Sequence, residues 1–296
     1  MRFAVAVVAP VGYVHSQAFR EVAEALHYGL RALGHDSLLT TRLDYDDRHT
    51  IVLGSNVLAS FGWDPPKKPI LYNLEQVGDS SPEQVGDSSP WMTPAQLTLF
   101  RRHPVWDYSR ANIEQLAARG VSGLTHVPIG YVPQLTRIVP AAEDIDVLFY
   151  GLYSKRRQAV LNTLRAKRFR VERLIGVYGA ARDALIARSK IVINMHKYDA
   201  QVLEIVRISY LLANRRAVVS EPGRDPTEES DLAPGIAFAD YGELVDRCTE
   251  LLSEEGARRE IAERGYDLFS ARSQAAILDE ALAYTFDTAM QVGGLT

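Results

Sequence analysis

Short apolar runs alternate with amphipathic stretches from the first residues of the chain. Residues 3–9 form a β-type run, and residues 16–33 repeat apolar side chains at helical spacing up to Gly34, where a helix cap favours glycine. The alternation continues, which is typical of a wound α/β domain. Further strands are predicted at 37–41, 51–53, 69–74, 105–108 and 124–129, with helices at 94–101 and 113–119.

A second alternating series starts beyond a boundary that we place near residue 138. The pattern predicts two consecutive, doubly wound Rossmann-like domains, residues 1–137 and 138–272. The helix within 273–296 is expected to pack back on the first domain, so that the C-terminal helices bridge the two. Predicted strands are 146–150, 171–175, 191–194 and 217–221, and predicted helices are 156–168, 181–187, 202–214, 241–252, 255–264 and 273–290.

One predicted helix carries charge where its surroundings should be apolar. Residues 202–214 are apolar almost all the way round, so this helix must be buried. Yet Glu204 and Arg207 lie three residues apart and share one of its faces. The preceding strand ends at Asn194 and is followed by His196, at the sheet edge where open α/β folds place ligands. Buried charges need partners, and a ligand is one possible source.

Composition narrows the function classes. The formal net charge is -4, which argues against a general electrostatic grip on nucleic acid while leaving room for a local basic patch. No run approaches the roughly 18 apolar residues that a membrane span needs, and the start of the chain is a first strand rather than a signal peptide. The single cysteine, Cys248, excludes an internal disulfide and a cysteine-rich zinc site. These features favour a cytoplasmic protein.

A perfect tandem octapeptide, EQVGDSSP, occupies residues 75–82 and 83–90. It is too short for a solenoid repeat and is read as a surface loop. Because it follows a predicted strand, it either extends the rim of a ligand site or is an accidental duplication.

Several segments together resemble a known family. Residues 146–157 (DVLFYGLYSKRR), 191–196 (IVINMH), 203–212 (LEIVRISYLL) and 218–221 (VVSE) are similar to the donor half of GT-B glycosyltransferases, most of all to the group with a spore-protein-like (CgeB-like) C-terminal domain. The resemblance covers about residues 140–275. It implies two Rossmann-like domains that face each other across a cleft, a nucleotide-sugar held by the C-terminal domain, an acceptor held by the N-terminal one, and no metal or cofactor.

The resemblance also implies roles for individual donor-site residues. Gly151, Lys155 and Arg156 would hold the diphosphate, since a glycine after a strand admits the backbone and cations meet the phosphate charge. The alternative is a solvated helix start with surface cations. Glu204 would accept ribose hydroxyls and Arg207 would hold Glu204 or a phosphate, unless the two form only an internal ion pair.

Asn194 and His196 complete the predicted donor site. His196 would donate to a diphosphate or sugar oxygen, although a lone histidine is often a satisfied structural residue. Glu221, at the end of the next strand, either touches the ligand or caps the loop that follows it.

Catalytic candidates come from the first domain. An inverting transferase needs a general base, and His15, in the turn after the first strand, is the leading candidate; Glu75 and Asp107 are weaker ones. His15 is alternatively no more than polar sequence at a helix start. Retaining members of the fold carry a second glutamate eight residues after the first, where this chain has Leu212, so the stereochemical outcome stays open.

The sequence therefore predicts a metal-independent glycosyltransferase. Its donor would be a UDP-, GDP- or dTDP-linked sugar, and its acceptor, a glycan, protein, nucleic acid or small molecule, is not specified. Two alternatives remain open: a nucleotide-sugar epimerase on the same fold and a non-catalytic two-domain binding protein. The dinucleotide, nucleophile-elbow and phosphate-loop motifs are absent. The D-x-D pair Asp144 and Asp146 leads into a strand, away from the usual ligand edge.

Overall fold

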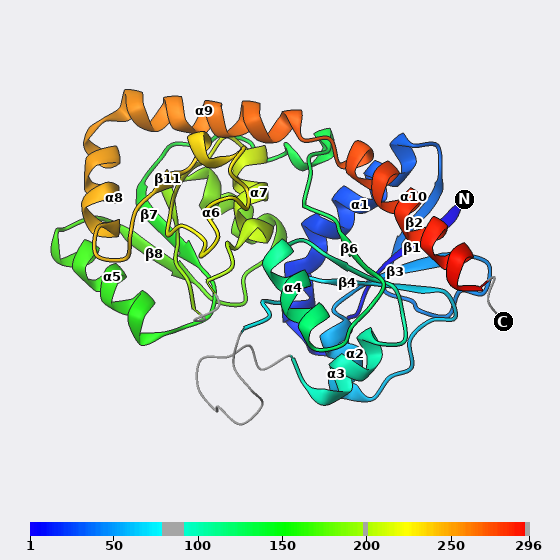
Figure 1. The fold of residues 1–296 in the computed structure, drawn as a ribbon. Coiled ribbons are helices and arrows are strands. Elements are labelled where there is room, and N and C mark those ends of the chain that lie inside the picture. Colours follow the sequence, from blue (N-terminus) through cyan, green and yellow to red (C-terminus); the bar gives the residue numbers. More distant parts are fainter. Residues whose placement is uncertain (79–91, 198–200, 294–296) are drawn as a thin grey trace. The chain divides into compact units, whose positions relative to one another are not determined.

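The computed structural model describes residues 1–78, 92–197 and 201–293, and the chain divides into two compact units (Figure 1). Unit 1 comprises Met1–Gln134 and Ser273–Thr296, and unit 2 comprises Leu135–Arg272. Each unit is built on its own parallel sheet. Among the helices of these described residues, none is both long and apolar enough to cross a membrane.

The sheet of unit 1 has six parallel strands in the order β2-β1-β3-β4-β5-β6. Because β2 and β3 flank β1, the direction of winding reverses there, and the loops after β1 and β3 open at this switch point. The strands are β1 (Arg2–Val7), β2 (Asp36–Thr40), β3 (His49–Leu53), β4 (Pro69–Asn73), β5 (Val105–Asp107) and β6 (Leu124–His126).

Helices cover both faces of this sheet. One face carries a core of aliphatic and aromatic side chains shared by β3, β4, β5 and the helices α2 (Ser55–Phe61), α3 (Pro94–Phe100) and α4 (Arg110–Ala118). Helices α1 (Arg20–Ala32) and α10 (Gln274–Gly293) pack on each other in the same unit, close enough that Gly29 faces Leu278. The Trp106 indole donates to Thr285 Oγ1 at 2.9 Å and ties α10 to β5.

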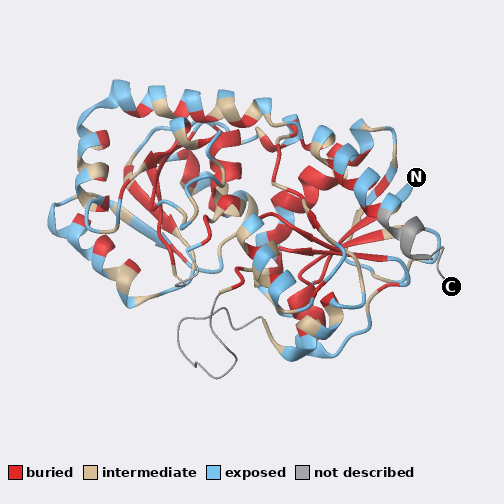
Figure 2. Ribbon diagram, in the orientation of Figure 1, coloured by how far each residue is buried: buried red, intermediate tan, exposed pale blue. Residues whose placement is uncertain are grey.

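Unit 2 has five parallel strands in the order β11-β10-β9-β7-β8. Its switch point lies between β7 and β9, because β8 is added on one side and β10 on the other. The strands are β7 (Ile145–Tyr150), β8 (Val171–Leu174), β9 (Ser189–Asn194), β10 (Ala217–Ser220) and β11 (Ala237–Phe238). Figure 2 shows that the strands of both units are largely buried.

The helices of unit 2 also form two layers. Helices α5 (Lys155–Ala166) and α8 (Leu244–Ser253) share an apolar core with β7, β9 and β10. Helix α6 (Gly179–Ala187) contacts β7 and β9, while α7 (Ile205–Ala213) and α9 (Glu255–Ala271) contact β10 and each other. Short 3-10 turns lie at Val14–Phe19, Pro133–Leu135 and Ala233–Gly235.

Several elements differ from the sequence prediction. The helix predicted at 202–214 begins at Ile205, so that Glu204 is its N-cap, and the short strand β11 was not predicted. The seven-residue helix α2 was not predicted, because Gly54 and Gly62 on either side of it are typical of a loop. Helix α9 was predicted to end near Gly265 but continues to Ala271. Gly265 serves close packing instead: a Cβ there would stand 2.7 Å from Leu212 Cδ2 and 2.8 Å from the Gly235 carbonyl oxygen. The octapeptide prediction falls mostly on residues 79–91, outside the described residues.

This packing predicts opposite effects for two glycines of the same helix. Gly265→Ala should destabilise the protein by about 1–3 kcal/mol, because the new methyl overpacks the contact with Leu212 and Gly235. Gly256→Ala should stabilise it by up to roughly 1 kcal/mol, since a Cβ there meets nothing within 4 Å. Urea unfolding of both variants measures the difference. A gain in stability for Gly265→Ala would show that the helix does not need its glycine.

Candidate functional site

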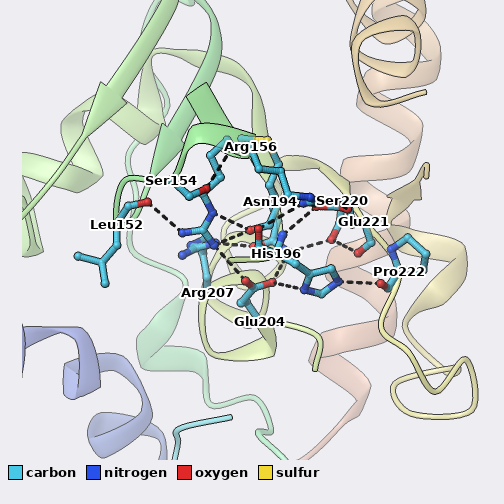
Figure 3. Close-up of polar contacts among 12 residues, drawn as sticks. Leu152, Ser154, Arg156, Asn194, His196, Glu204, Arg207, Ser220, Glu221 and Pro222 are labelled. Carbon is cyan, nitrogen blue, oxygen red and sulfur yellow. Dashed lines mark hydrogen bonds and ion pairs between the residues drawn. The ribbon is translucent and has the colours of Figure 1, made fainter. Parts of the chain in front are cut away.

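The polar groups of unit 2 gather at its switch point. The loops that follow β7, β9 and β10 leave the same edge of the sheet, and Asn194 at the end of β9 pairs in register with Ser220 at the end of β10. Glu204 lies at the start of α7, next to this edge. Figure 3 shows these side chains turned toward one another. Six of the predicted donor-site residues are brought together here: Gly151, Arg156, Asn194, His196, Glu204 and Arg207.

Asn194 is the central residue of this cluster and is fully buried. Its Nδ2 donates to Glu204 Oε2 and to Ser220 Oγ, both at 2.9 Å. Its Oδ1 accepts a hydrogen bond from Arg207 Nη1. Because both amide hydrogens are used on one side, the carbonyl oxygen must face Arg207, and the amide orientation is fixed.

The Glu204 carboxylate is nearly enclosed by donors. Oε1 accepts from Arg157 Nη2 at 3.2 Å, and Oε2 accepts from Asn194 and lies 3.3 Å from His196 Nδ1. Burial alone would raise the pKa of Glu204, but His196, Arg207 and Arg157 together lower it. Glu204 is therefore an ionised anchor. Its side chain remains 15% exposed, so a small part of it reaches the surface.

His196 is built into the cluster through both ring nitrogens. Nε2 donates to the Pro222 carbonyl at 2.7 Å, while Nδ1 makes an ion-pair contact with Glu204 rather than an aligned hydrogen bond. Burial lowers the pKa of His196, but Glu204, Pro222 and Glu221 outweigh it and raise the pKa above its usual 6.5. The structure thus places His196 between protein groups, which matches the structural alternative left open by the sequence.

Arg156 holds the loop after β10. Its guanidinium makes a two-pronged hydrogen bond with the buried Glu221 carboxylate and stacks on the Tyr241 ring, 3.9 Å from the ring centroid. Glu221 also accepts from the His196 main-chain N–H at 2.8 Å. These contacts use both terminal nitrogens of the Arg156 guanidinium. Arg156 therefore supports the edge of the sheet more than it presents a cation to a ligand.

Arg157 is a residue that the sequence reasoning missed as a site member. It is buried, and it donates to the Met195 carbonyl, to the Leu152 carbonyl at 3.0 Å and to Glu204. The signal that identifies it is its place three residues after Ser154, the N-cap whose Oγ accepts from the Arg157 main-chain N–H at 3.2 Å. This cap sets the direction of the helix and turns Arg157 inward, whereas Lys155 is exposed and outside the cluster.

Arg207 interacts with the charge of Glu204 but is held by a hydrogen bond to Asn194 and not by a direct ion pair. Within the described ranges, no carboxylate lies within 4 Å of its guanidinium, although Arg156 and Arg157 each have one. Arg207 also stands over the Tyr150 ring at 5.3 Å. A Cβ at Gly151 would lie 2.9 Å from Arg207 Nη2 and would shift the guanidinium from this approach, and the φ of +150° itself favours glycine.

The electrostatic balance of the cluster is positive. Three guanidinium groups, from Arg156, Arg157 and Arg207, face two carboxylates, from Glu204 and Glu221. The N-terminus of the 12-residue helix α5 adds partial positive charge beside Gly151. An anion with several oxygen atoms would match the excess charge at this edge.

Unit 1 fixes Glu75 at the equivalent edge of its own sheet. The main-chain N–H of Glu75 donates to Asn73 Oδ1 at 3.2 Å, and its carbonyl accepts from Asn73 Nδ2 at 2.9 Å and from Asn112 Nδ2 at 3.1 Å. Asn56 Nδ2 donates to Glu75 Oε1 at 3.3 Å. Glu75 is half-buried, so its carboxylate is held firmly without being enclosed.

His15 lies in the 3-10 turn after β1, near the switch point of unit 1, and is half-buried. Tyr13 packs edge-on against His15 with ring centroids 5.6 Å apart. Burial and the charge of Glu75 both raise the pKa of Tyr13, which places this tyrosine near both catalytic candidates. Asp107, the other candidate, is fully buried and hydrogen-bonded to Asn73 and Asn112.

The structure also places two further sequence features, the D-x-D pair and Leu212. Asp144 pairs with Arg188 and Arg170, and Asp146 pairs with Lys190, so both carboxylates of the D-x-D pair serve structural ion pairs. Within the described part of the chain, no group of three or more His, Cys, Asp or Glu side chains is arranged to hold a metal ion. Leu212 is fully buried and faces Gly265 on α9, which explains its apolar character.

Comparisons with known proteins identify the fold. No protein-family model matches the sequence. The chain is 27% identical over 192 residues to uncharacterized protein R358 of Acanthamoeba polyphaga mimivirus, an alignment that covers 63% of this chain and 62% of the relative, less than two thirds of its length.

Solved structures match over nearly the whole chain. AviGT4, a glycosyltransferase involved in avilamycin A biosynthesis, is 17% identical with a TM-score of 0.60, covering 96% of this chain and 97% of its own. HepE from Anabaena, solved in complex with UDP and glucose, is 12% identical with a TM-score of 0.58 over all of both chains. The fold class predicted from the sequence, α/β with two Rossmann-like domains of GT-B type, is therefore confirmed. The spore-protein-like subgroup and a cleft between the domains stay predictions.

The contacts of His196 predict a defined pH dependence of stability. Because the folded-state pKa lies above 6.5, the charged imidazole contributes stability that is fully present below that pH and is lost as pH rises through the folded pKa. Glu204, whose pKa is lowered, keeps its contribution throughout this range, since loss begins only as pH falls below its usual 4.5.

The measurement is urea unfolding of wild type and His196→Gln at about pH 6 and about pH 9. The stability advantage of wild type should shrink toward the higher pH. An advantage that is constant or grows with pH would contradict the contact between the charged ring and Glu204.

Proposed function

We propose that the chain is a glycosyltransferase that moves a sugar from a nucleotide-diphosphate sugar to an acceptor. The observation that carries this proposal is the positive excess at the switch point of unit 2, where Arg207 donates a hydrogen bond to Asn194 but has no carboxylate within 4 Å among the described residues. Such a group is suited to the diphosphate of the donor, whose negative charge grows as the sugar leaves.

The diphosphate is proposed to lie against Gly151, Arg207 and the start of α5. Gly151 admits the phosphate oxygens close to the main chain, and the N–H groups of the first turn of α5 point toward the same edge. Arg207 supplies a full positive charge whose orientation is already fixed, so little reorganisation is needed when the donor binds. Because the chain itself provides these cations, we propose transfer without a metal. Lys155, exposed at the helix start, is a secondary contact.

Glu204 is proposed to retain the ribose role in addition to its internal one. Among the described residues, only Arg157 donates to Oε1, so a lone pair on this oxygen is able to accept a ribose hydroxyl. The supporting residues of this site are Asn194, His196 and Arg156. Together they hold Glu204, Arg207 and the loop after β10 in place.

UDP is the proposed nucleotide. The complex of HepE with UDP and glucose supports this choice, because that protein shares the fold over its full length. GDP- and dTDP-sugars are the alternatives, and direct comparison of the three separates them.

Unit 1 is proposed to hold the acceptor and to supply the general base. Glu75 is favoured over His15, which led in the sequence analysis, since both main-chain groups and one carboxylate oxygen of Glu75 are held by amides. A base fixed in this way is positioned before the acceptor arrives.

Product analysis tests the proposed reaction. The chain is incubated with UDP-, GDP- and dTDP-sugars, with water or a sugar panel as acceptor, and nucleotide release and sugar products are quantified. A glycosyltransferase releases UDP and a transferred or hydrolysed sugar. Interconversion of the nucleotide sugar without UDP release would indicate the epimerase, and ligand-dependent thermal stabilisation without any product would indicate the binding protein.

A matched pair of arginine and lysine variants tests the donor site. Arg207→Ala should weaken UDP binding by about tenfold to a hundredfold, because a charge-assisted contact with the diphosphate is lost. Lys155→Ala, an exposed cation a few residues from Gly151, should weaken it by less than about threefold. Calorimetric titration with UDP gives both values. Equal effects of the two variants would mean that Arg207 acts only as bulk charge, and no effect of Arg207→Ala would contradict the site.

A further inference from the structure

We infer that Asp107 is a positioning residue for Glu75: a buried carboxylate that sets the orientation of two amides and, through them, the place of the catalytic base. This inference rests on the proposed function, because it takes Glu75 as the general base. It adds a residue whose effect on turnover is transmitted and not direct.

Asp107 lies at the end of β5 and is fully buried. Its Oδ2 accepts from Asn73 Nδ2 at 2.6 Å, and its Oδ1 accepts from Asn112 Nδ2 at 3.0 Å and from the Ser109 main-chain N–H at 2.9 Å. The start of α4, capped by Ser109, adds partial positive charge close to the carboxylate.

The two amides continue from Asp107 to the loop after β4. The other hydrogen of each Nδ2 goes to the Glu75 carbonyl, from Asn73 at 2.9 Å and from Asn112 at 3.1 Å. The oxygen of each amide accepts a main-chain N–H of the loop, from Glu75 at 3.2 Å and from Val77 at 2.9 Å. The main chain of Glu75 is thus held on both sides by groups that Asp107 holds.

The chemistry of a carboxylate explains why aspartate fits this position. An ionised carboxylate only accepts hydrogen bonds, so both amides must turn their NH₂ groups toward it. Their oxygens are then left for the loop N–H groups. An asparagine at 107 would present an NH₂ group to one of these donors, and relieving that conflict requires an amide flip, which removes the acceptor from the N–H of Glu75 or Val77.

These hydrogen bonds connect Asp107, at the end of β5, to the main chain of Glu75, whose carboxylate is the proposed base. Glu75 Oε1 accepts from Asn56, and burial together with the charge of Glu75 raises the pKa of Tyr13, whose ring packs against His15. A shift of the Glu75 main chain would move the carboxylate from the acceptor hydroxyl, and displacement of about 1 Å is enough to cost roughly a hundredfold in rate.

A double-mutant cycle tests the inference on the full chain. Asp107→Asn should lower kcat for the nucleotide sugar that wild type turns over by about tenfold to a hundredfold, with UDP affinity unchanged within about twofold. Glu75→Gln should lower kcat further. In the Glu75→Gln background, Asp107→Asn should have little additional effect, because its influence passes through the missing carboxylate.

A matched control separates positioning from simple loss of stability. Gln96, buried in α3 of the same unit, donates to Ser55 Oγ at 2.8 Å and is not one of the described residues that hold Glu75 through hydrogen bonds. Gln96→Met should lower the melting temperature while leaving kcat near wild type. If Asp107→Asn does not fold, Asn112→Ser takes its place in the cycle, with the same lack of additivity expected.

Three results would overturn the inference. If Asp107→Asn keeps the wild-type kcat while Glu75→Gln is inactive, the inference is contradicted and the proposed function is not. Wild-type kcat for Glu75→Gln defeats the proposed base and the inference with it. A full further loss from Asp107→Asn in the Glu75→Gln background shows that Asp107 acts independently of Glu75.

Discussion

A carboxylate that is removed from water must be surrounded by donors, and it then dictates how its neighbours are oriented. Glu204 does this in unit 2. Its contact with Asn194 Nδ2 turns the Asn194 carbonyl toward Arg207, and this fixes the one guanidinium of the cluster that has no carboxylate partner among the described residues. The arrangement of the edge proposed to bind the diphosphate therefore depends on a single buried negative charge.

The same arrangement occurs in unit 1 with different residues. Asp107 takes the place of Glu204 as the acceptor, and Asn73 and Asn112 take the place of Asn194 as oriented amides. The group presented to the edge is a carboxylate, Glu75, in one unit and a cation, Arg207, in the other. These are the charges that proton abstraction and diphosphate binding require.

Much of the fold follows from the spacing of apolar residues. Fully buried parallel strands read as short apolar runs, and β7, β9 and β10 were predicted within two residues of their observed ends. Helix α2 was not predicted because seven residues between two glycines are too few to show a helical period. Helix α9 was cut short because a glycine within a helix is read as an end, whereas Gly265 is required by the close approach of Gly235.

The site was predictable at the level of residue types but not of partners. Glu204 and Arg207 were expected on one face of a buried helix, and both lie at the start of α7. Their contacts, however, are made through Asn194, because the end of β9 places this amide between Glu204 and Arg207, and spacing along the helix does not reveal it. Arg157 was missed for a related reason: two adjacent arginines look alike until a helix cap turns one of them inward.

The shared fold does not by itself identify the function of the chain. Identities of 12–17% to AviGT4 and HepE accompany a shared arrangement of sheets and helices, while the assignment of function depends on the side chains at the sheet edges. Some of those side chains also restrict which residues can stand next to them. Arg207 and Gly151 are constrained jointly, since any Cβ at 151 would press against the guanidinium.

A crystal structure of the chain with UDP is the most direct test of the donor site. The account predicts a diphosphate within hydrogen-bonding distance of Arg207 and of the main chain between Gly151 and the first turn of α5, with Asn194 still joining Glu204 to Arg207. A diphosphate bound away from this edge, or an Arg207 that turns from it to pair with a protein carboxylate, would contradict the account.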